Sequence, residues 1–477
     1  MLHIDENCRA VARADKLAVI VDAAPYFAVA RQALIEAQQR IMLVGWDFDA
    51  RIVLDADATE GPAKVGDLLL WLVDRNPALN LYLLRWDLGA IKSLFRGTTI
   101  VSLLKLMRHP RIHVRLDGHH PTGASHHQKI VCIDDCLAFC GGIDMTDERW
   151  DTRDHQDDDP RRLNASGKPY KPWHDATTAV SGPAAGALAE ICRERWLLGT
   201  GETLAPVDAQ RDCWPAGLDP MFEHVDIGIA QTRPEMPTEA GLLQIEALFI
   251  DQIAAAKRHV YCESQYFASR RIAEAIARRL DEPDGPEIVI VNPVTAQGWL
   301  EPLAMDTARA RLMEALKRRD RHGRLRMYHP YTAGGAPIYV HAKLTIVDDR
   351  QLRVGSANMN NRSLRLDTEC DLIVVADDAA TAATIAAVRD RLLGEHLGVT
   401  PEQVAATIAA EGSLIGAVER LRGDGRSLRP YEAKDLAGIE KWLADNEVLD
   451  PEGPEEMFEA LSKRGLFRGR LKRHRNA

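Results

Sequence analysis

The stretch HQKIVCIDDCLAFCGGIDM (residues 127–145) has a close counterpart far downstream, HAKLTIVDDRQLRVGSANM (residues 341–359). Aligned without gaps, six of the 19 positions are identical, and they include the histidine, the lysine, both aspartates and one glycine. The apolar positions between them also match in character. Two such stretches in one chain indicate an internal repeat.

The segments around these stretches repeat as well. Residues 33–49 and 248–267 each have the pattern of a helix followed by a strand, and each precedes its own stretch. The Ala-rich amphipathic helices expected at 183–196 and 379–398 follow. Matching elements in the same order predict a duplicated α/β unit.

The expected domain boundaries follow from this repeat. The first half is expected over residues 1–210 and the second over residues 220–400, with a linker containing Pro and Asp between them. A helical segment with a basic tail is expected over residues 401–477.

The composition is typical of a globular protein with an ample core. Of the 477 residues, 46% are hydrophobic and 27% are charged. No apolar run approaches the roughly 20 residues of a bilayer-spanning helix, and the polar N-terminus is unlike a secretory signal. A cytoplasmic protein is therefore expected. The net charge of −10 argues against a nucleic-acid partner.

Eight cysteines form no CxxC pair and are too few for a disulfide framework. Cys132, Cys136 and Cys140 recur every four residues, which leaves a zinc site as an alternative. The surrounding residues alternate as in strands, so thiols that fill apolar space are the favoured interpretation.

Each repeat places a histidine and a lysine on one side of an extended segment. Side chains alternate along a strand, so His127 and Lys129 share a face about 7 Å apart, as do His341 and Lys343. Asp134 falls on the opposite face at the far end of its strand. We expect it to serve as a turn residue or a buried hydrogen-bond acceptor rather than as a catalytic carboxylate.

A returning strand brings a short polar side chain back in each half, Asp144 in the first and Asn358 in the second. If the halves pair about a pseudo-twofold axis, the two sets meet in one pocket. Two lysines and an amide form an anion site suited to phosphate. One imidazole can attack phosphorus while the other protonates the leaving oxygen.

A carboxylate on the far ring nitrogen would hold the tautomer of each histidine. Glu369, in RLDTECDL, and Asp151, in ERWDTRD, are the candidates. The scheme requires no metal and no cofactor.

The duplicated pattern His-x-Lys-x4-Asp, at His127 and again at His341, resembles the phospholipase D superfamily. The phrases GGID, RWDT, PWHD, YCESQYF and GSANMNNRS resemble its phosphatidylcholine-type branch rather than the small nucleases, which carry one motif and dimerise. The resemblance spans roughly residues 15–400. It implies two α/β/α sandwich halves with mixed sheets, related by a pseudo-twofold axis.

The resemblance also implies roles for individual residues. His127 would be the nucleophile, and His341 the acid that protonates the departing alcohol and then the base that activates water or a primary alcohol. Glu369 would orient His341, and Asp151 is a looser match for a partner of His127. The remaining site residues implied are Lys129, Lys343 and Asn358, which would hold the phosphoryl oxygens, and the motif aspartates Asp134 and Asp348.

Several residues keep two interpretations. His119, His120, His126 and His127 crowd together and leave a metal site open, although the second repeat keeps only His341. The acidic segment 153–162 is either a calcium site or, as we favour, a solvated loop. Trp46, Asp47, Glu263 and Gln265 end strands near the motifs and are candidate pocket residues, with a position in the core as an equal alternative for Trp46. His174 and Asp175 lack an evident counterpart, which favours a structural or local substrate-binding role.

The leading hypothesis is a phosphodiesterase that hydrolyses glycerophospholipids at a membrane surface to phosphatidate and an alcohol, with exchange of head groups as a further activity. The alternatives are a cardiolipin synthase-type transferase, a nuclease and a catalytically silent lipid-binding scaffold. A monomer with an internal pseudo-dimer is expected. The basic tail, residues 461–477, is either solvated or attracted to anionic lipid, which would make the protein peripheral to the membrane.

Overall fold

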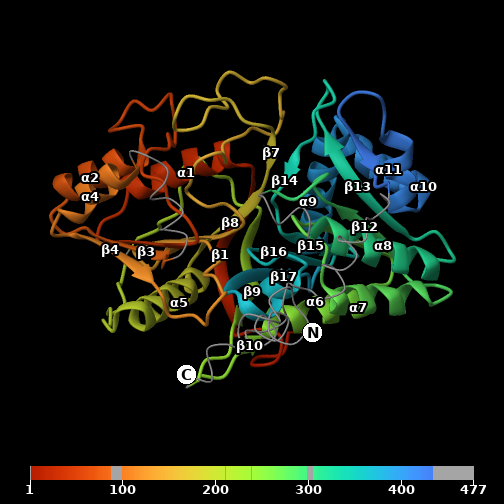
Figure 1. Cartoon of the computed structure of the whole chain (residues 1–477), viewed down its shortest axis with the longest axis horizontal. Coiled ribbons are helices and arrows are strands. Elements are labelled where there is room, and N and C mark those ends of the chain that lie inside the picture. The colour runs from red at the N-terminus through yellow and green to blue at the C-terminus, as the bar shows by residue number, and fades with distance from the viewer. Residues whose placement is uncertain (1, 88–98, 210, 238, 298–304, 433–477) are drawn as a thin grey trace, which may run out of the picture.

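The computed structural model describes residues 2–87, 99–209, 211–237, 239–297 and 305–432. Its elements form two halves that stand side by side, the first coloured red to yellow-green and the second green to blue (Figure 1). Within the described ranges, no helix combines the length and apolar character needed to cross a bilayer. The basic tail, for which membrane attraction was one interpretation, lies outside these ranges.

Among the described residues of the first half, seven strands join the central sheet and an eighth, β7, pairs elsewhere. The strands are β1 (Ala10–Val21), β2 (Arg40–Gly45), β3 (Asn80–Trp86), β4 (Ile112–Asp117), β5 (Ile130–Ile133), β6 (Leu137–Gly141), β7 (Trp173–His174) and β8 (Ala176–Ser181). The helices are α1 (Ala23–Ile35), α2 (Val65–Arg75), α4 (Thr99–Met107) and α5 (Pro183–Thr200).

The second half follows the same plan. Its strands are β9 (Phe222–Arg233), β10 (Leu242–Leu243), β11 (His259–Glu263), β12 (Glu287–Val291), β13 (Leu325–Tyr331), β14 (Tyr339–Val340), β15 (Leu344–Val347), β16 (Gln351–Gly355) and β17 (Glu369–Val375). Its helices are α6 (Gln244–Ala255), α7 (Arg270–Leu280), α8 (Thr307–Arg319), the π-helical turn η2 (Arg362–Leu366) and α9 (Ala379–Leu397).

The strand order shows the duplication directly. Outward from the centre, the first half runs β1-β8-β6-β5-β2-β3-β4 and the second runs β9-β17-β16-β15-β11-β12-β13. The two central strands, β1 and β9, pair antiparallel, with Ala10 opposite Ile229 and Leu17 opposite Phe222. The sheets of the two halves are therefore one continuous mixed sheet, with equivalent strands at equivalent distances from the β1–β9 pair.

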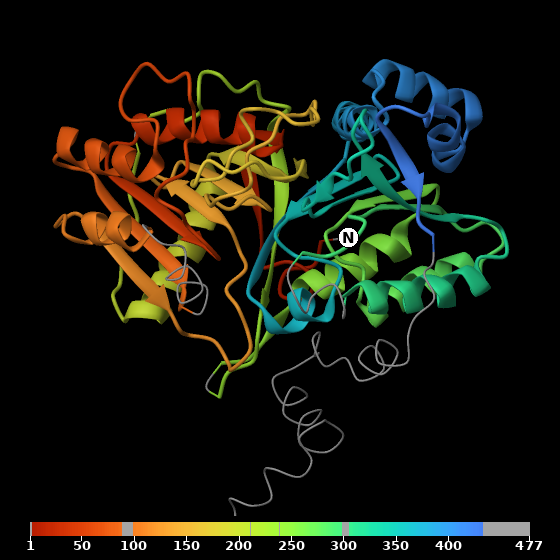
Figure 2. The same ribbon diagram turned by 45° about the horizontal axis from the view of Figure 1, so that its top comes forward.

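Helices cover both faces of this sheet in each half, which gives the expected α/β/α layering (Figure 2). The strands that follow the motifs, β5 and β15, are buried along their whole length, as expected for strands composed mainly of apolar residues. Helix α9 begins where Asp378 accepts a hydrogen bond from the backbone N–H of Thr381, and it ends at Gly398, whose φ of 66° suits glycine.

The segment after residue 400 is not purely helical. Helices α10 (Pro401–Glu411) and α11 (Leu414–Leu421) are followed by strand β18 (Ser427–Pro430), which pairs antiparallel with β13 at the sheet edge. This segment is thus attached to the second half. Residues 433–477 lie outside the described ranges.

One disulfide joins Cys136, in the turn after β5, to Cys213, near the end of the first half. Local sequence patterns did not predict this pair, because the two cysteines lie 77 residues apart. Cys132 and Cys140 are buried free thiols, so the regularly spaced cysteines do not gather around a metal.

Candidate active site

The two motifs meet across the boundary between the halves. The backbone N–H of His127 donates to the carbonyl of Thr368 in the second half (2.9 Å), and that of His341 donates to the carbonyl of His174 in the first half (2.7 Å). Strands β7 and β14 pair parallel beside this second contact. Each motif therefore approaches the other half, as a pseudo-twofold arrangement requires.

Each motif histidine and lysine stands on the short segment that leads into the buried strand rather than inside the strand. β5 begins at Ile130 and β15 at Leu344, each one residue after the motif lysine. The lysines fold back so that Lys129 Nζ donates to the carbonyl of His127 (2.5 Å) and Lys343 Nζ to that of His341. Each ammonium is thereby held beside its own histidine.

A carboxylate from the other half contacts Nδ1 of each histidine. Nδ1 of His127 lies 2.9 Å from Oε1 of Glu369, and Nδ1 of His341 lies 2.7 Å from Oδ2 of Asp175. Both carboxylates are fully buried. A carboxylate at Nδ1 favours the tautomer that carries its proton there, which leaves Nε2 for chemistry.

This pairing corrects the expectation from sequence. Glu369 contacts His127 rather than His341, and Asp151 contacts neither histidine. Asp151 accepts the backbone N–H of Trp173 (2.8 Å) and an Arg162 N–H (3.1 Å), so it holds the 146–172 loop in place. The sequence-based pairing was wrong because each motif reaches into the opposite half. His127 therefore lies beside the start of β17, and His341 lies beside the start of β8.

Asp175 and Glu369 occupy equivalent places in the two halves. Glu369 begins β17 and Asp175 immediately precedes β8, and each of these strands leads into an Ala-rich helix, α9 or α5. That relation to the helix was readable in the sequence. The long loop 146–172, which has no equally long counterpart in the second half, obscured it and left Asp175 without an evident counterpart.

The aspartates that complete the motifs hold turns instead of reaching the site. Asp134 accepts the backbone N–H groups of residues 38, 39 and 40, and Asp348 accepts those of residues 257, 258 and 259. Both adopt a positive φ, 48° and 53°. They fix the start of β2 and β11 relative to the motif strands, which is a structural role and not a catalytic one.

Burial shifts the pKa values of the charged groups. Burial lowers the pKa of Lys343 to about 7, against the opposing attraction of Asp175. Burial also raises the pKa of Glu369 to about 8, although Lys129 opposes that rise. For Asp175 the outcome is reversed: burial would raise its pKa, but His341 and Lys343 together lower it.

Burial disfavours the charged form of both motif histidines. Burial, followed by the charge of the neighbouring lysine, lowers the pKa of His127 and of His341 well below the usual value. His127 also responds to Lys343 from the other half, so the two motifs act on each other electrostatically. A bound phosphate anion would offset the lysines and ease protonation of one imidazole.

The short polar residues differ between the halves. Lys129 Nζ lies 3.3 Å from Oδ2 of Asp144. The counterpart Asn358 donates to Oε1 of Gln265 (3.4 Å), and its buried Oδ1 accepts no hydrogen bond within the described residues. The first half therefore offers a lysine that is already paired, and the second offers an uncharged amide.

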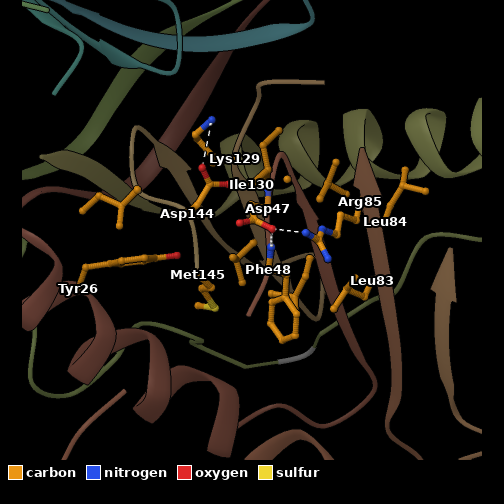
Figure 3. A pocket seen from close by; sticks show the side chains of 15 residues that line it. Tyr26, Asp47, Phe48, Leu83, Leu84, Arg85, Lys129, Ile130, Asp144 and Met145 are labelled. Atoms are coloured by element: carbon orange, nitrogen blue, oxygen red, sulfur yellow. Dashed lines mark hydrogen bonds and ion pairs between the residues drawn. The ribbon is translucent and has the colours of Figure 1, made fainter. Parts of the chain in front are cut away.

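A small cavity lies beneath Lys129, inside the first half (Figure 3). Asp144 points to Lys129, and Asp47 forms an ion pair with Arg85 and accepts the backbone N–H of Phe48. Lys129 lines this cavity, but neither motif histidine does. The cavity therefore lies behind Lys129 and is not the place where the two motifs meet. Of the other candidate pocket residues, Trp46 makes an edge contact with the His127 ring, at 6.4 Å between centroids.

The crowded histidines near the first motif have separate partners. His126 contacts Thr368 Oγ1 (2.9 Å) and Asp117 (3.1 Å), and His120 contacts Asp87 (2.9 Å). Within the described residues they do not converge as metal ligands. The acidic loop is also less solvated than expected, because His155 and Asp159 are buried.

Comparison with known proteins agrees with this geometry. A family model described as "Phospholipase D" matches residues 33–214, and one described as "Cardiolipin synthase, PLD-like domain" matches residues 249–391. Together they cover both motifs, one in each half.

Curated proteins with similar sequences include phospholipase D A of Dictyostelium discoideum, 24% identical over 80% of this chain and 35% of that protein. Phospholipase D alpha 1 of Zea mays is 24% identical over 77% of this chain and 63% of that protein. The chain thus spans between about a third and two thirds of the length of these relatives.

Among solved structures, phosphatidylserine synthase of Haemophilus influenzae Rd KW20 superposes with a TM-score of 0.55 at 13% identity, over 81% of this chain and 89% of that one. At this identity the likeness concerns the fold. With the duplicated motif and both family models, these observations establish that the chain belongs to the phospholipase D superfamily.

Proposed function

We propose that this protein is a phosphodiesterase that cleaves glycerophospholipids to phosphatidate and a free head-group alcohol. One observation carries the proposal: two histidines, each with a lysine beside it and a buried carboxylate on Nδ1, converge from the two halves. Two imidazoles and two ammonium groups match the needs of phosphoryl transfer, namely a nucleophile, an acid and charge stabilisation.

In the first step, Nε2 of His127 attacks phosphorus and the bond from phosphorus to the head-group oxygen breaks. The proton on Nε2 of His341 passes to that oxygen, which leaves as an alcohol. In the second step, His341 takes a proton from water as the water attacks phosphorus, and the P–N bond breaks. Phosphatidate is released and His127 is free again. Lys129, Lys343 and Asn358 stabilise the phosphoryl oxygens throughout.

The two carboxylates support this division of labour. Asp175 stays ionised because His341 and Lys343 lower its pKa, so its charge favours an imidazolium at His341. Burial raises the pKa of Glu369 to about 8, so Glu369 adds less negative charge beside His127 than Asp175 adds beside His341. His127 is thereby kept neutral, as a nucleophile must be.

The test uses phosphatidylcholine vesicles and the full-length chain. His127→Asn and His341→Asn should each abolish choline release, and retained hydrolysis by either variant contradicts a mechanism with two histidines. In a rapid alkaline quench, mass spectrometry should find a phosphoramidate adduct on His127 of the wild-type protein. An adduct on His341 would reverse the two roles.

Phosphatidyl transfer is the second candidate, favoured by the description of the model that matches residues 249–391. The same intermediate would then react with a lipid hydroxyl or a primary alcohol in place of water. Incubation with phosphatidylglycerol alone, and with phosphatidylcholine plus ethanol, separates the outcomes by lipid mass spectrometry. Products that join two phospholipids identify a synthase, and phosphatidylethanol identifies head-group exchange. We further propose that one chain suffices, since its two halves supply both motifs.

A further inference from the structure

A second cluster of titratable side chains lies buried behind Asp175. It consists of Asp22, His155, His174 and Glu395, whose side chains are at most 2% exposed. Asp22 lies between β1 and α1, His155 in the 146–172 loop, His174 in β7 and Glu395 in α9. One atom from each of these side chains lies within 4.8 Å of each of the others.

The spacing of these atoms suits a small cation. Oε1 of Glu395 lies 3.1 Å from Nε2 of His155 and 2.9 Å from Nδ1 of His174. The carboxylate of Asp22 lies 3.6 Å from the first of these nitrogens and 3.3 Å from the second. Four ligands at the usual zinc bond lengths, arranged as a tetrahedron, are separated by about 3.3 Å.

The opposite ring nitrogens are held as in a zinc site. Nδ1 of His155 faces Oδ2 of Asp151 (3.1 Å), and Nε2 of His174 faces Oε2 of Glu263 (2.7 Å). Zinc-bound histidines regularly donate their free N–H to a carboxylate, which fixes the tautomer that binds the metal. Both imidazoles have such a carboxylate on the side away from the cluster.

The hydrogen-bond partners of these four side chains also favour a bound cation. Without a cation, both nitrogens of His155 and of His174 face carboxylates, so each of these contacts requires a proton on the ring nitrogen or on the carboxyl group. Even then, Oδ2 of Asp22 is buried and accepts no hydrogen bond. One divalent cation in place of two protons leaves the net charge unchanged and gives that oxygen a partner.

We propose that Asp22, His155, His174 and Glu395 form a structural zinc site. Two imidazoles and two carboxylates suit Zn²⁺, whereas Ca²⁺ and Mg²⁺ prefer ligand sets of oxygen alone. With four protein ligands the site is closed, so the ion would hold structure rather than activate water.

The ion would fix the geometry of the motif site from behind. It would join α9 of the second half to three ligands of the first half. His174 is adjacent to Asp175, and its carbonyl accepts the backbone N–H of His341. A cation bound to His174 would thus hold both the second motif and its carboxylate in position.

The first experiment measures metal in the wild-type full-length chain, expressed in zinc-supplemented and in zinc-depleted medium. Elemental analysis after gel filtration should find one zinc per chain in the supplemented protein, and its Tm should exceed that of the depleted protein. With Co²⁺ in place of zinc, the protein should show the visible absorption of tetrahedral cobalt. No bound metal, an unchanged Tm and no cobalt spectrum would overturn the proposal.

The matched variants are His155→Gln, Glu395→Gln and His396→Gln. His396 is also a buried histidine bonded to a carboxylate, Glu263, but it is not one of the four proposed ligands. The first two variants should lose the zinc and His396→Gln should keep it. Zinc retained in both ligand variants, or lost equally in all three, would overturn the assignment. A variant that fails to fold leaves the wild-type cobalt spectrum to decide.

Discussion

The two halves of the motif site have the same framework and different chemistry. In the second half, His341 faces an ionised Asp175, and the neighbouring polar groups are the amides of Asn358 and Gln265. In the first half, His127 faces Glu369, whose pKa burial raises to about 8, and Asp144 pairs with Lys129. A symmetric scaffold thus supports an unequal distribution of protons, which a reaction with one nucleophile and one acid requires.

The largest expected effect is the loss of kcat when the carboxylate beside either histidine is replaced by an amide. Asp175→Asn removes a charge and disturbs the His341 tautomer, so kcat should fall by roughly 10⁴-fold. Glu369→Gln replaces a group that is already mainly neutral at pH 7, so kcat should fall only about tenfold. Steady-state kinetics on both variants at pH 7 measure this. Equal losses would mean that the two carboxylates act alike.

The next effect exchanges the short polar residues between the halves. Asn358→Asp puts a carboxylate beside the phosphate and should lower kcat/KM about 100-fold, which corresponds to about 2.7 kcal/mol. Asp144→Asn frees Lys129 from its ion pair and should leave kcat within about threefold while KM falls. Should Asp144→Asn be as damaging as Asn358→Asp, the carboxylate at Asp144 is needed in the reaction.

A smaller effect concerns pH. Lys343, whose pKa burial lowers to about 7, is a cation below that pH and neutral above it. Phosphate binding by the free enzyme should therefore weaken as pH rises, with kcat/KM falling up to about tenfold per unit above pH 7. Glu369→Gln should retain this descending limb. Its disappearance in that variant would assign the limb to Glu369 instead.

The smallest effect on activity is expected at the disulfide, which lies in the first half. Cys136→Ser combined with Cys213→Ser should leave kcat within about twofold, because the polar contacts of the two sulfur atoms are with Ile133 and Arg211 and not with a motif histidine or lysine. The free energy of unfolding should fall by roughly 2–4 kcal/mol, since the crosslink restricts the unfolded chain. Urea unfolding with and without reductant measures this, and an unchanged midpoint would show that the bond does not stabilise the protein.

Local sequence patterns predicted the repeat, both His-Lys pairs and the structural role of Asp134. These depend on strand periodicity and turn chemistry, which short windows of sequence contain. The partners of the histidines were mispredicted, because Glu369 and Asp175 reach the motifs only when the halves cross. The buried cluster around His155 was not predicted either, because its four residues come from four segments that are distant in the sequence. In addition, the acidic segment 153–162 was interpreted as a solvated loop.

The two halves belong to one polypeptide and share a continuous sheet through the β1–β9 pair, and this has a genetic consequence. In a dimer of identical chains, every substitution appears on both sides of the twofold axis at once. Here a codon change at residue 175 leaves residue 369 untouched. Selection can therefore act on the acid and on the nucleophile separately, and the differences between Asp175 and Glu369 and between Asp144 and Asn358 are of the kind that such freedom allows.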